Sequence, residues 1–455
     1  MVLEKIRSEI LEVADSAIKH ARDLNIPTAE AYVIKKSLTS LEYSKGKTES
    51  RDGMVQGVGV RVAEGKKVGF ATCSGFNLDS IKTSLENAYK IAKNRPEDPR
   101  FSGFVSDSKH GIEGVLDSEL AQLDSETQVE KLKSLVDECD IDDQRIVATN
   151  LSAQTEWGGY AVATTEGCMV SSMKTIHVGT AYIIAMAEDD RSTAFDFTVG
   201  RTIQDFTGIG TNAIERAVKH LGAKPLGDTL KVPTIWYPLS ASYLLSTALT
   251  VGLNGGTVVE KQNPLGSKLN EQIATPSLQL NDNGQIPTKA STDAVDAEGT
   301  AIGKNEIIKD GVLKSFLFDN FYGPASGGKS TGNAHRNAPT EYESIPTIGP
   351  NKLIIEPGQK DLEQQLAECD KAIYIEGMPM GMGHSNMITG DFSVTATNAY
   401  LVEKGEIVYP VKSVSIAGNF FKSLMDIQEI GSDVIDLPFP LESTTLTIQN
   451  HTIAG

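Results

Sequence analysis

The spacing of apolar residues changes from helical to alternating and back, and this order constrains the fold more than any other feature of the chain. Residues 2–23 place apolar side chains three or four positions apart, as on one face of a helix. Residues 30–72 then alternate between apolar and polar side chains, which is typical of half-buried strands, with Glu64-Gly65 as the expected hairpin turn. Residues 77–92 return to helical spacing. We therefore expect an N-terminal α/β unit with antiparallel strands.

A second unit repeats the same order. Helical spacing over residues 129–136 is followed by alternating runs between residues 145 and 200, and then by another helical stretch over residues 209–221. Proline and glycine are frequent between Arg95 and Gly114, where we place the boundary between the two units.

Beyond Pro225 the chain consists mainly of short alternating runs separated by glycine-containing turns. Two stretches differ: the apolar Leu239–Leu253, LSASYLLSTALTVGL, which we expect to be a buried helix, and Asn419–Ile430, an expected closing helix. Many short strands with regular turns favour an antiparallel barrel or sandwich. The sequence thus predicts an α+β protein with two N-terminal α/β units and a C-terminal β-rich domain. The expected domains are residues 1–105, 115–223 and 226–455.

Charge and cysteine content exclude several classes of protein. Acidic residues outnumber basic ones, 60 to 42, and the lysines and arginines form no basic patch, so the sequence gives no support for nucleic-acid binding. The four cysteines are far apart and form no CxxC pair, which fits a reducing compartment. The N-terminus has no apolar signal-peptide core, and no stretch has the roughly 18 apolar residues of a membrane span. We expect a cytoplasmic protein that does not bind membranes.

One segment, GPASGGKS at Gly323–Ser330, matches the phosphate-binding pattern G-x-x-x-x-G-K-[ST]. Such a loop binds phosphate because its backbone N–H groups converge at the N-terminus of the helix that follows. Here the following residues include Gly332 and Pro339 and lack helical spacing. We expect a glycine-rich surface loop, with a nucleotide site as the alternative.

The common local patterns of hydrolase active sites do not occur in the chain. No two of the seven histidines lie within five residues of each other, none is followed directly by glutamate, and there is no G-x-S-x-G. A metal site would have to be assembled from distant residues, for example His335 and His384. A serine–histidine pair assembled from distant segments is a further alternative.

Two C-terminal segments have an unusual composition. The stretch TDAVDAEGT contains Asp293, Asp296 and Glu298, and we expect a turn whose aspartates accept backbone N–H groups, with a metal or acid–base site as the alternative. The stretch Gly377–Ser393, GMPMGMGHSNMITGDFS, is rich in glycine, which permits close approach of another chain. Its methionines either form a pliable binding surface or fill the core.

Several of these segments together resemble one known family. The runs VDAEGT and STGNAHR, and TGDFSVTATNAYLVEKGEIVYPV followed by IAGNF, are similar to the TldD/PmbA family, and closest to its PmbA branch, also called TldE. The N-terminal GVGVRV and KKVGFATCSG also match the family's opening domain. The likeness covers nearly the whole chain in order, and the C-terminal series is its most specific part.

The resemblance implies a cytosolic metallopeptidase system that matures or degrades peptides. In this family the TldD-type subunit has a zinc-binding HExxxH motif on a helix of the third domain. The corresponding stretch here, Tyr243–Leu253, reads YLLSTALTVGL and contains neither histidine nor glutamate. The resemblance therefore implies a partner subunit without catalytic residues, metal ligands or cofactor of its own, which pairs with a TldD-like subunit that binds zinc.

The family-matched loops supply candidates for contact with peptide substrate or partner. These residues are Asp296, Glu298, Asn333, Arg336, Gly390 and Asp391. Arg336 is suited either to bind a peptide carboxylate or carbonyl or to form a structural salt bridge. Two other functions stay open. One is a self-sufficient metal-dependent peptidase with dispersed ligands, and the other is a non-catalytic, homodimeric peptide-binding protein. The dispersed ligands would be His335, His384, Asp296 and Glu298.

Overall fold

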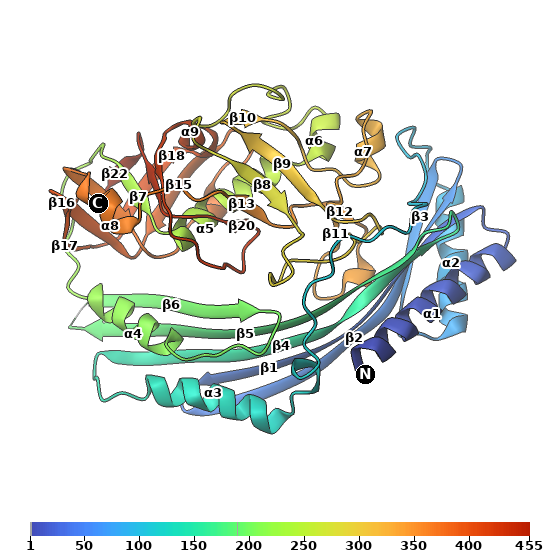
Figure 1. Cartoon of the computed structure of the whole chain (residues 1–455), viewed down its shortest axis with the longest axis horizontal. Helices are drawn as coiled ribbons and strands as arrows, with labels where there is room; N and C mark the ends of the chain where they lie inside the picture. Colours follow the sequence, from blue (N-terminus) through green and yellow to red (C-terminus); the bar gives the residue numbers. More distant parts are fainter. Residues whose placement is uncertain (1, 189) are drawn as a thin grey trace.

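The computed structural model describes residues 2–188 and 190–455 of the 455-residue chain. Its largest element is a long, curved antiparallel sheet of six strands in the order β3-β2-β1-β4-β5-β6 (Figure 1). The strands are β1 (Thr28–Ser44), β2 (Lys47–Glu64), β3 (Lys67–Ser74), β4 (Ile146–Thr164), β5 (Met169–Ala187) and β6 (Asp190–Gly200). In the middle, β1 pairs with β4 along the whole stretch Glu30–Ser44. The strands of both N-terminal units therefore form one continuous sheet.

The β2–β3 hairpin turns one residue later than predicted. Glu64 pairs with Lys67, so the two turn residues are Gly65 and Lys66. Gly65 takes φ +60°, a positive value that two-residue hairpin turns require at their first position and that glycine adopts without strain. The expected turn at Glu64-Gly65 was wrong because it placed glycine second.

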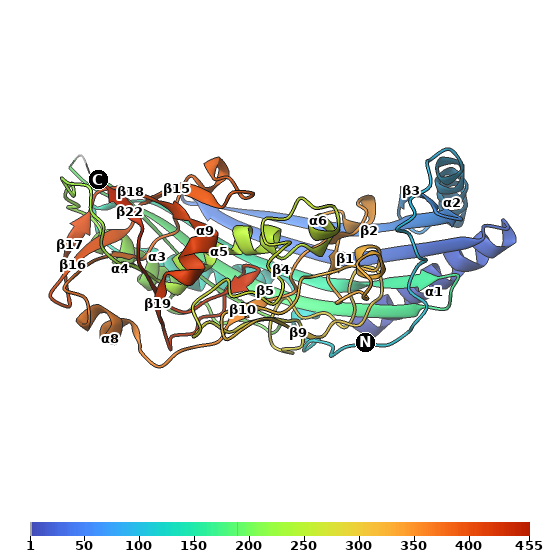
Figure 2. The same cartoon turned by 90° about the horizontal axis from the view of Figure 1, so that it is seen from above.

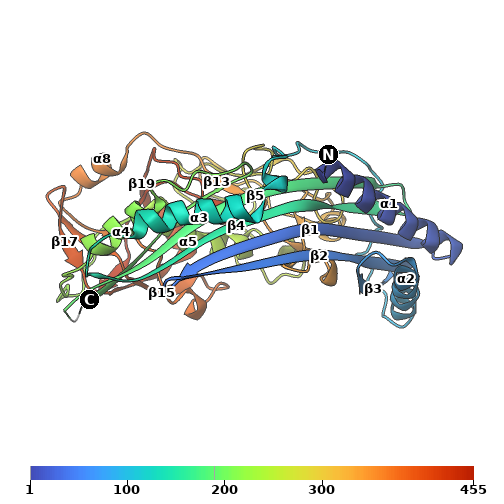
Figure 3. The same ribbon diagram turned by 90° about the horizontal axis from the view of Figure 1, so that it is seen from below.

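Four helices cover one face of this sheet (Figure 3). They are α1 (Val2–Asp23), α2 (Leu78–Lys93), α3 (Ser125–Cys139) and α4 (Ile209–Lys219). Helices α1 and α2 share a core with one half of the sheet, and α3 and α4 share another core with the other half. The predicted helical face of α1 is confirmed, since Ile6 and Ile10 are buried, and each fully buried large aliphatic side chain contributes roughly 1.5–3 kcal/mol. On α2 and α3 the predicted faces are confirmed except at Ile91 and Val129, which are exposed.

The chain from β7 onward lies over the opposite face of the sheet and is β-rich, as predicted (Figures 1 and 2). Its sheets have the strand orders β10-β9-β8-β13-β20, β17-β16-β14-β7-β21-β19, β15-β18-β22 and β11-β12. All are open, so the described residues contain no closed barrel. The strands are β7 (Thr234–Trp236), β8 (Leu280–Asn283), β9 (Lys304–Lys309), β10 (Val312–Leu313), β11 (Ala334–His335), β12 (Thr347–Ile348), β13 (Leu353–Ile355), β14 (Lys371–Ile375), β15 (Asp391–Ala396), β16 (Ala399–Glu403), β17 (Glu406–Val411), β18 (Val414–Asn419), β19 (Ile427–Ile430), β20 (Leu441–Glu442), β21 (Leu446–Ile448) and β22 (Thr452–Ala454).

The helical elements of this part are short except for one. They are α5 (Pro238–Gly252), α6 (Gly255–Val259), α7 (Tyr322–Ala325), α8 (Leu362–Ala367), α9 (Phe420–Met425) and the 3-10 turns η2 (Glu341–Glu343) and η3 (Met382–His384); a further turn, η1 (Leu120–Gln122), precedes α3. Helix α5 is the predicted apolar helix, and Leu244, Leu245 and Leu249 belong to the core that it shares with strands of three sheets. It is thus the central packing element of the C-terminal domain.

The predicted closing helix over Asn419–Ile430 is too long. Helix α9 ends at Met425, and Ile427–Ile430 form β19, which pairs with β21. The apolar spacing of Phe420, Leu424 and Ile427 fits both a helix and a helix followed by a strand. The pairing of Ile427–Ile430 with the buried strand β21 favours the second arrangement.

Residues between α2 and η1 form a connection without helix or strand that crosses to the C-terminal domain. The Gly111 N–H donates to the Ala294 carbonyl (2.7 Å) and the Val115 N–H to the Pro287 carbonyl (2.8 Å). The buried Arg201, just after β6, donates to the carbonyls of Val115 (2.8 Å) and Met173 (2.9 Å). The connection is therefore held between the sheet and the domain above it.

No helix among residues 2–188 and 190–455 combines the length and the apolar character that a membrane crossing requires.

Candidate functional site

A buried cluster of charges joins the sheet to the C-terminal domain. On the sheet, Arg61 of β2 donates two hydrogen bonds to the Glu30 carboxylate of β1 (2.8 and 2.5 Å). From the C-terminal domain, Glu298 accepts from Arg61 (2.7 Å) and Arg336 donates to Glu30 (3.1 Å). The Glu30, Glu298 and Arg336 side chains are at most 2% exposed. Because an unpaired charge at this depth would cost several kcal/mol, these four residues, the interdomain charge cluster, fix the domain on the sheet.

Arg336 forms the structural salt bridge that was one of its two predicted roles. Its guanidinium carbon lies 4.4 Å from the centre of the Tyr32 ring, and it also donates to the Ser344 carbonyl. Burial lowers the pKa of Arg336 to about 10, so the side chain remains charged at neutral pH. Its Nε has no hydrogen-bond partner within the described residues.

Asp296 and Asn333 hold the loops that carry the cluster. The Asp296 carboxylate accepts the N–H groups of Glu298 and Thr300 (both 2.9 Å) and of Ala334 (3.1 Å), which is the predicted turn. Burial, with the nearby Glu298, raises the pKa of Asp296 to about 8. The Asn333 amide donates to Asp282 (2.7 Å) and to the Gly349 carbonyl (2.9 Å). Four of the six predicted contact residues therefore lie together, inside the molecule.

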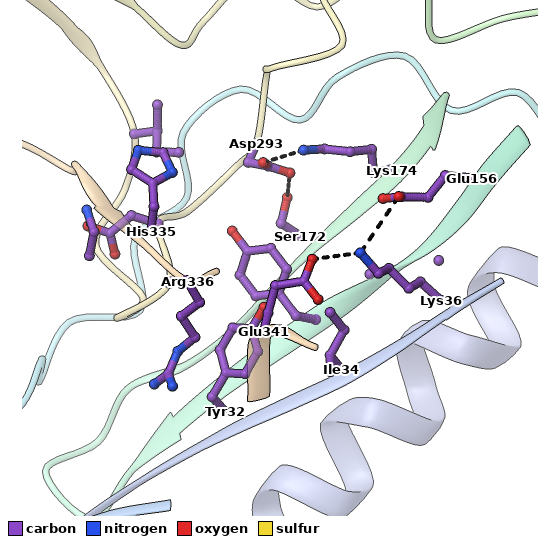
Figure 4. Close-up of a pocket in the computed structure, with 17 residues that line it drawn as sticks. Tyr32, Ile34, Lys36, Glu156, Ser172, Lys174, Asp293, His335, Arg336 and Glu341 are labelled. Carbon is purple, nitrogen blue, oxygen red and sulfur yellow. Dashed lines mark hydrogen bonds and ion pairs between the residues drawn. The ribbon is translucent and has the colours of Figure 1, made fainter. Parts of the chain in front are cut away.

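A polar cavity of about 170 Å³ lies beside the cluster, between the sheet and the C-terminal domain (Figure 4). Lys36 contacts Glu341 (2.6 Å) and Glu156 (3.6 Å) on one side, and Lys174 contacts Asp293 (2.7 Å) on the other. Each lysine thus has a carboxylate partner. The cavity is lined by Tyr32, Ile34, Lys36, Glu156, Gly158, Gly159, Tyr160, Ser172, Lys174, Asp293, Asp296, Ala297, Ile302, Ala334, His335, Arg336 and Glu341.

His335 lines the same cavity. Its Nε2 lies 3.0 Å from the Gly349 carbonyl. A carbonyl only accepts, so Nε2 has the proton and Nδ1 has the lone pair. Burial lowers the pKa of His335, which keeps the ring neutral.

A second cavity, of about 380 Å³, adjoins the N-terminal half of α5; we call it the α5 cavity. It is lined by Tyr182, Thr193, Ala194, Phe195, Arg216, Leu239, Tyr243, Glu376, Gly377, Met378, Pro379, Met380, Gly381, Thr397 and Asn398. Arg216 lies 3.9 Å from Glu376 and 3.3 Å from Asp196, so the cavity combines apolar walls with one ion-pair network. Met378 and Met380 line it whereas Met382 is buried, so both predictions for the methionine-rich segment apply in part.

Gly390 and Asp391 lie apart from the other predicted contact residues. Gly390 takes φ +83°, and a Cβ there would lie 2.6 Å from the Phe421 ring, so only glycine fits. Asp391 is exposed at the start of β15 and accepts from Asn419 (2.9 Å) and Thr389 (2.8 Å). The two residues belong to a local turn in which Gly390 is buried and Asp391 is exposed.

The four dispersed metal ligands are not brought together. Within the part of the chain that the structure describes, no three His, Cys, Asp or Glu side chains form a group that could hold a metal ion. Both Glu298 oxygens are occupied, by Arg61 and by the Asn320 N–H (2.7 Å), and His384 is exposed on η3. A serine–histidine pair exists, with Ser423 Oγ 2.8 Å from His451 Nε2, but both residues are buried in the core and line neither cavity.

The GPASGGKS segment is the predicted surface loop. Its first residues belong to α7, residues 326–329 are exposed, and no helix follows Ser330 before β11. The backbone arrangement that binds phosphate in nucleotide-binding proteins is therefore not formed here.

Comparison with known proteins decides the family. Three family models match in chain order: PmbA/TldA metallopeptidase domain 1 over residues 29–92, the central domain over 118–221 and the C-terminal domain over 229–455. The chain belongs to the PmbA/TldD metallopeptidase family. This confirms the resemblance seen in the sequence.

Individual members of the PmbA/TldD family are similar over most of their length. An uncharacterized protein of Methanocaldococcus jannaschii is 29% identical over 81% of this chain and 83% of its own, and Metalloprotease PmbA of Escherichia coli O157:H7 is 26% identical over 94% and 92%. Haemophilus influenzae contains both a Metalloprotease TldD homolog (23% identical) and a Metalloprotease PmbA homolog (24%). The crystal structure of TldE from Thermococcus kodakarensis has the same fold, with a TM-score of 0.89 at 23% identity over 97% of this chain and 100% of that one.

The donor groups on α5 do not fit a zinc site of the kind found in metallopeptidases. Zinc needs three nitrogen, oxygen or sulfur ligands and a water. The buried positions of α5 include Leu244, Leu245, Ala248 and Leu249, and the Ser240 hydroxyl already donates to the Ile375 carbonyl (2.9 Å). No step of a metal-dependent reaction can be assigned to this helix.

Proposed function

We propose that this chain is the PmbA/TldE-like subunit of a cytosolic metallopeptidase that matures or degrades peptides. It pairs with a TldD-like, zinc-binding member of the family and supplies part of the wall around the substrate, while the partner supplies the catalytic ion.

The observation that carries this proposal is the composition of α5. The resemblance places the zinc-binding HExxxH of TldD-type members on the corresponding helix. Here that helix has the sequence PLSASYLLSTALTVG, without histidine, cysteine or carboxylate, and its leucines fill the core. Inserting a metal ligand there would leave a polar group without a partner in an apolar core, so the helix is suited to packing and not to catalysis.

The α5 cavity supports the same role. It lies between the sheet and the C-terminal domain and is large enough, at about 380 Å³, for one or two peptide side chains. Its walls are mostly apolar, and Met380 on the glycine-rich segment is 60% exposed, so the segment can adapt to different side chains. An extended peptide would place alternate side chains into such a cavity.

Reconstitution tests the proposal. The tagged chain is expressed alone and together with the HExxxH-bearing family member of the same cell, captured, and assayed for cleavage of unfolded peptides by mass spectrometry. We expect co-purification, cleavage only when both chains are present, and zinc in proportion to the partner. The Met380→Glu variant should reduce cleavage several-fold, whereas Ile388→Glu, exposed on the same segment but outside the cavity, should not.

Two results would contradict the proposal. A stoichiometric metal in the isolated chain, accompanied by cleavage, would make it a self-sufficient peptidase. Peptide binding by a homodimer that neither joins the family partner nor supports cleavage would make it a binding protein.

A further inference from the structure

A third and larger cavity, of about 570 Å³, lies at the end of the interdomain charge cluster where Arg61 and Glu298 meet. We call it the aromatic cavity. Its walls come from β3, from the segment that follows α2, and from two segments of the C-terminal domain, residues 319–322 and 345–346. Its volume is in the range of small-molecule sites, roughly 300–1,000 Å³. The proposed function does not use it.

Aromatic rings form most of the apolar wall. They are Phe70, Phe101, Phe104, Phe321 and Tyr322. Phe101 and Phe104 are buried and pack edge to face, with centroids 5.2 Å apart. The Tyr322 hydroxyl donates to Glu260 (2.6 Å), which also accepts from Arg100 (3.0 Å), so the wall is held in place across the domain boundary. Such a preformed wall suits a flat or branched apolar group.

The rings are already in contact with cations. The guanidinium carbon of Arg61 lies 5.0 Å from the centre of the Phe104 ring, and that of Arg100 lies 5.3 Å from Phe321 and 5.5 Å from Tyr322. A cationic ligand would therefore meet like charges at three of the five rings. This argues against an ammonium ligand.

The cations differ in their partners. Arg61 is neutralised by Glu30 and Glu298, and Arg100 by Asp98 and Glu260. Lys66 and Arg95, both exposed, contact only backbone carbonyls, those of Pro99 (2.6 Å) and Val68 (3.4 Å), and no carboxylate of the described residues is within ion-pair distance. One carboxylate of the wall, the exposed Glu97, is likewise outside any ion pair of the described residues. Two such cations against one such carboxylate leave a local excess of positive charge, which favours an anion.

Asp319 lies at the buried end of the cavity. One of its oxygens accepts the N–H groups of Phe321 (3.1 Å) and Tyr322 (2.7 Å). Burial, together with the neighbouring Glu298, raises the pKa of Asp319 to about 7, so at neutral pH this carboxyl adds less than a full negative charge. The Asp319 carboxyl therefore does not cancel the attraction of Lys66 and Arg95 for an anion.

We propose that the aromatic cavity binds a carboxylate attached to an aromatic group, either a small aromatic acid or the last residue of a peptide. The apolar group packs against the phenylalanine rings, and the carboxylate binds Lys66 and Arg95.

The test uses the full chain and three probes in titration calorimetry at low salt. N-acetylphenylalanine has the carboxylate, N-acetylphenylalaninamide lacks it, and acetyl-Ala-Ala-Phe presents it at the end of a peptide. We expect the acid to bind at least about tenfold more tightly than the amide. Arg95→Gln and Lys66→Gln should each weaken the acid several-fold and leave the amide unchanged, while Lys82→Gln, an exposed cation on α2 outside the cavity, should change neither.

A second variant tests the apolar part without disturbing the core. Ile345 lines the cavity and is 55% exposed, so the uncharged variant Ile345→Gln should fold and should reduce binding of the acid several-fold. Tighter binding of the tripeptide than of the single residue would assign a peptide terminus, and the opposite order a small acid. No saturable binding of either acid, equal affinity for acid and amide, or binding insensitive to both Arg95→Gln and Ile345→Gln would overturn the proposal. None of these readouts depends on a partner or on peptidase activity.

Discussion

The two regions where the C-terminal domain meets the sheet are built in opposite ways. In the interdomain charge cluster every carboxylate and guanidinium has an ionic partner, and the loops around it are fixed by the hydrogen bonds of Asp296 and Asn333. Around the α5 cavity most of the wall is apolar, Arg216 and Glu376 supply its charged groups, and Met380 is exposed. The first region holds the two parts of the molecule in register, and the second leaves space between them. The residues of the family-matched loops mostly serve the first purpose.

The largest effect should follow from breaking the cluster. Arg61→Ala leaves Glu30 and Glu298 buried without their main partner, and we expect a loss of about 3–5 kcal/mol in the free energy of unfolding, measured by denaturant titration. Arg51→Ala is the matched control, since it lies on the same strand with a side chain 68% exposed, and it should change stability by less than about 0.5 kcal/mol. Equal effects of the two variants would mean that the cluster does not fix the domains.

Protonation of two buried histidines should weaken the cores on either side of this boundary, while the raised pKa values of Asp296 and Asp319 act with the opposite sign. Burial lowers the pKa of His177 and of His451 to about 4, while the unfolded chain binds these protons near pH 6.5. Between these values the unfolded state binds more protons, so the stabilising contribution is present above about pH 6.5 and is lost as the pH falls. Each histidine should contribute a slope of about 1.4 kcal/mol per pH unit.

Denaturant titrations between pH 7 and 4.5 measure this slope. The His177→Asn variant keeps an acceptor for the Gln204 N–H (2.8 Å in the native protein) but cannot be protonated, so its stability should depend less steeply on pH. An unchanged slope would assign the acid sensitivity to other groups.

The smallest effect on stability should come from the α5 cavity. Met380→Gln changes an exposed side chain and should alter the free energy of unfolding by less than about 0.5 kcal/mol. It should nevertheless reduce peptide cleavage in the reconstituted pair, because it makes one wall of the cavity polar. A large loss of stability would show that this methionine fills the core instead.

The spacing of apolar residues predicted those helices and strands whose buried positions recur at regular intervals. The amphipathic α1 and the apolar α5 were both found from spacing alone, since each buries one or all of its faces. The helix predicted over Asn419–Ile430 failed in its second half because Ile427–Ile430 pair with β21, a strand outside that stretch of sequence. Local spacing contains no information about such a partner.

The candidate site was predicted less completely, for a related reason. The loops with Asp296, Glu298, Asn333 and Arg336 were found because their residues are unusual in sequence, yet their partners Glu30 and Arg61 lie on strands with an ordinary alternating pattern. Likewise, Arg216 and Phe195 of the α5 cavity gave no signal, because only the fold brings them beside Met380. The sequence identified one side of each contact.

The pairing of β1 with β4 has a consequence for how the molecule is made. A fragment ending near residue 105 would present the whole β1 edge, Glu30 to Ser44, as a row of unpaired amides, a template for misassembly with other chains. During synthesis the middle of the sheet cannot close until residue 164 has left the ribosome, long after β1 has emerged. We therefore expect the first unit to need the second before its sheet is complete, and the two units to fold together.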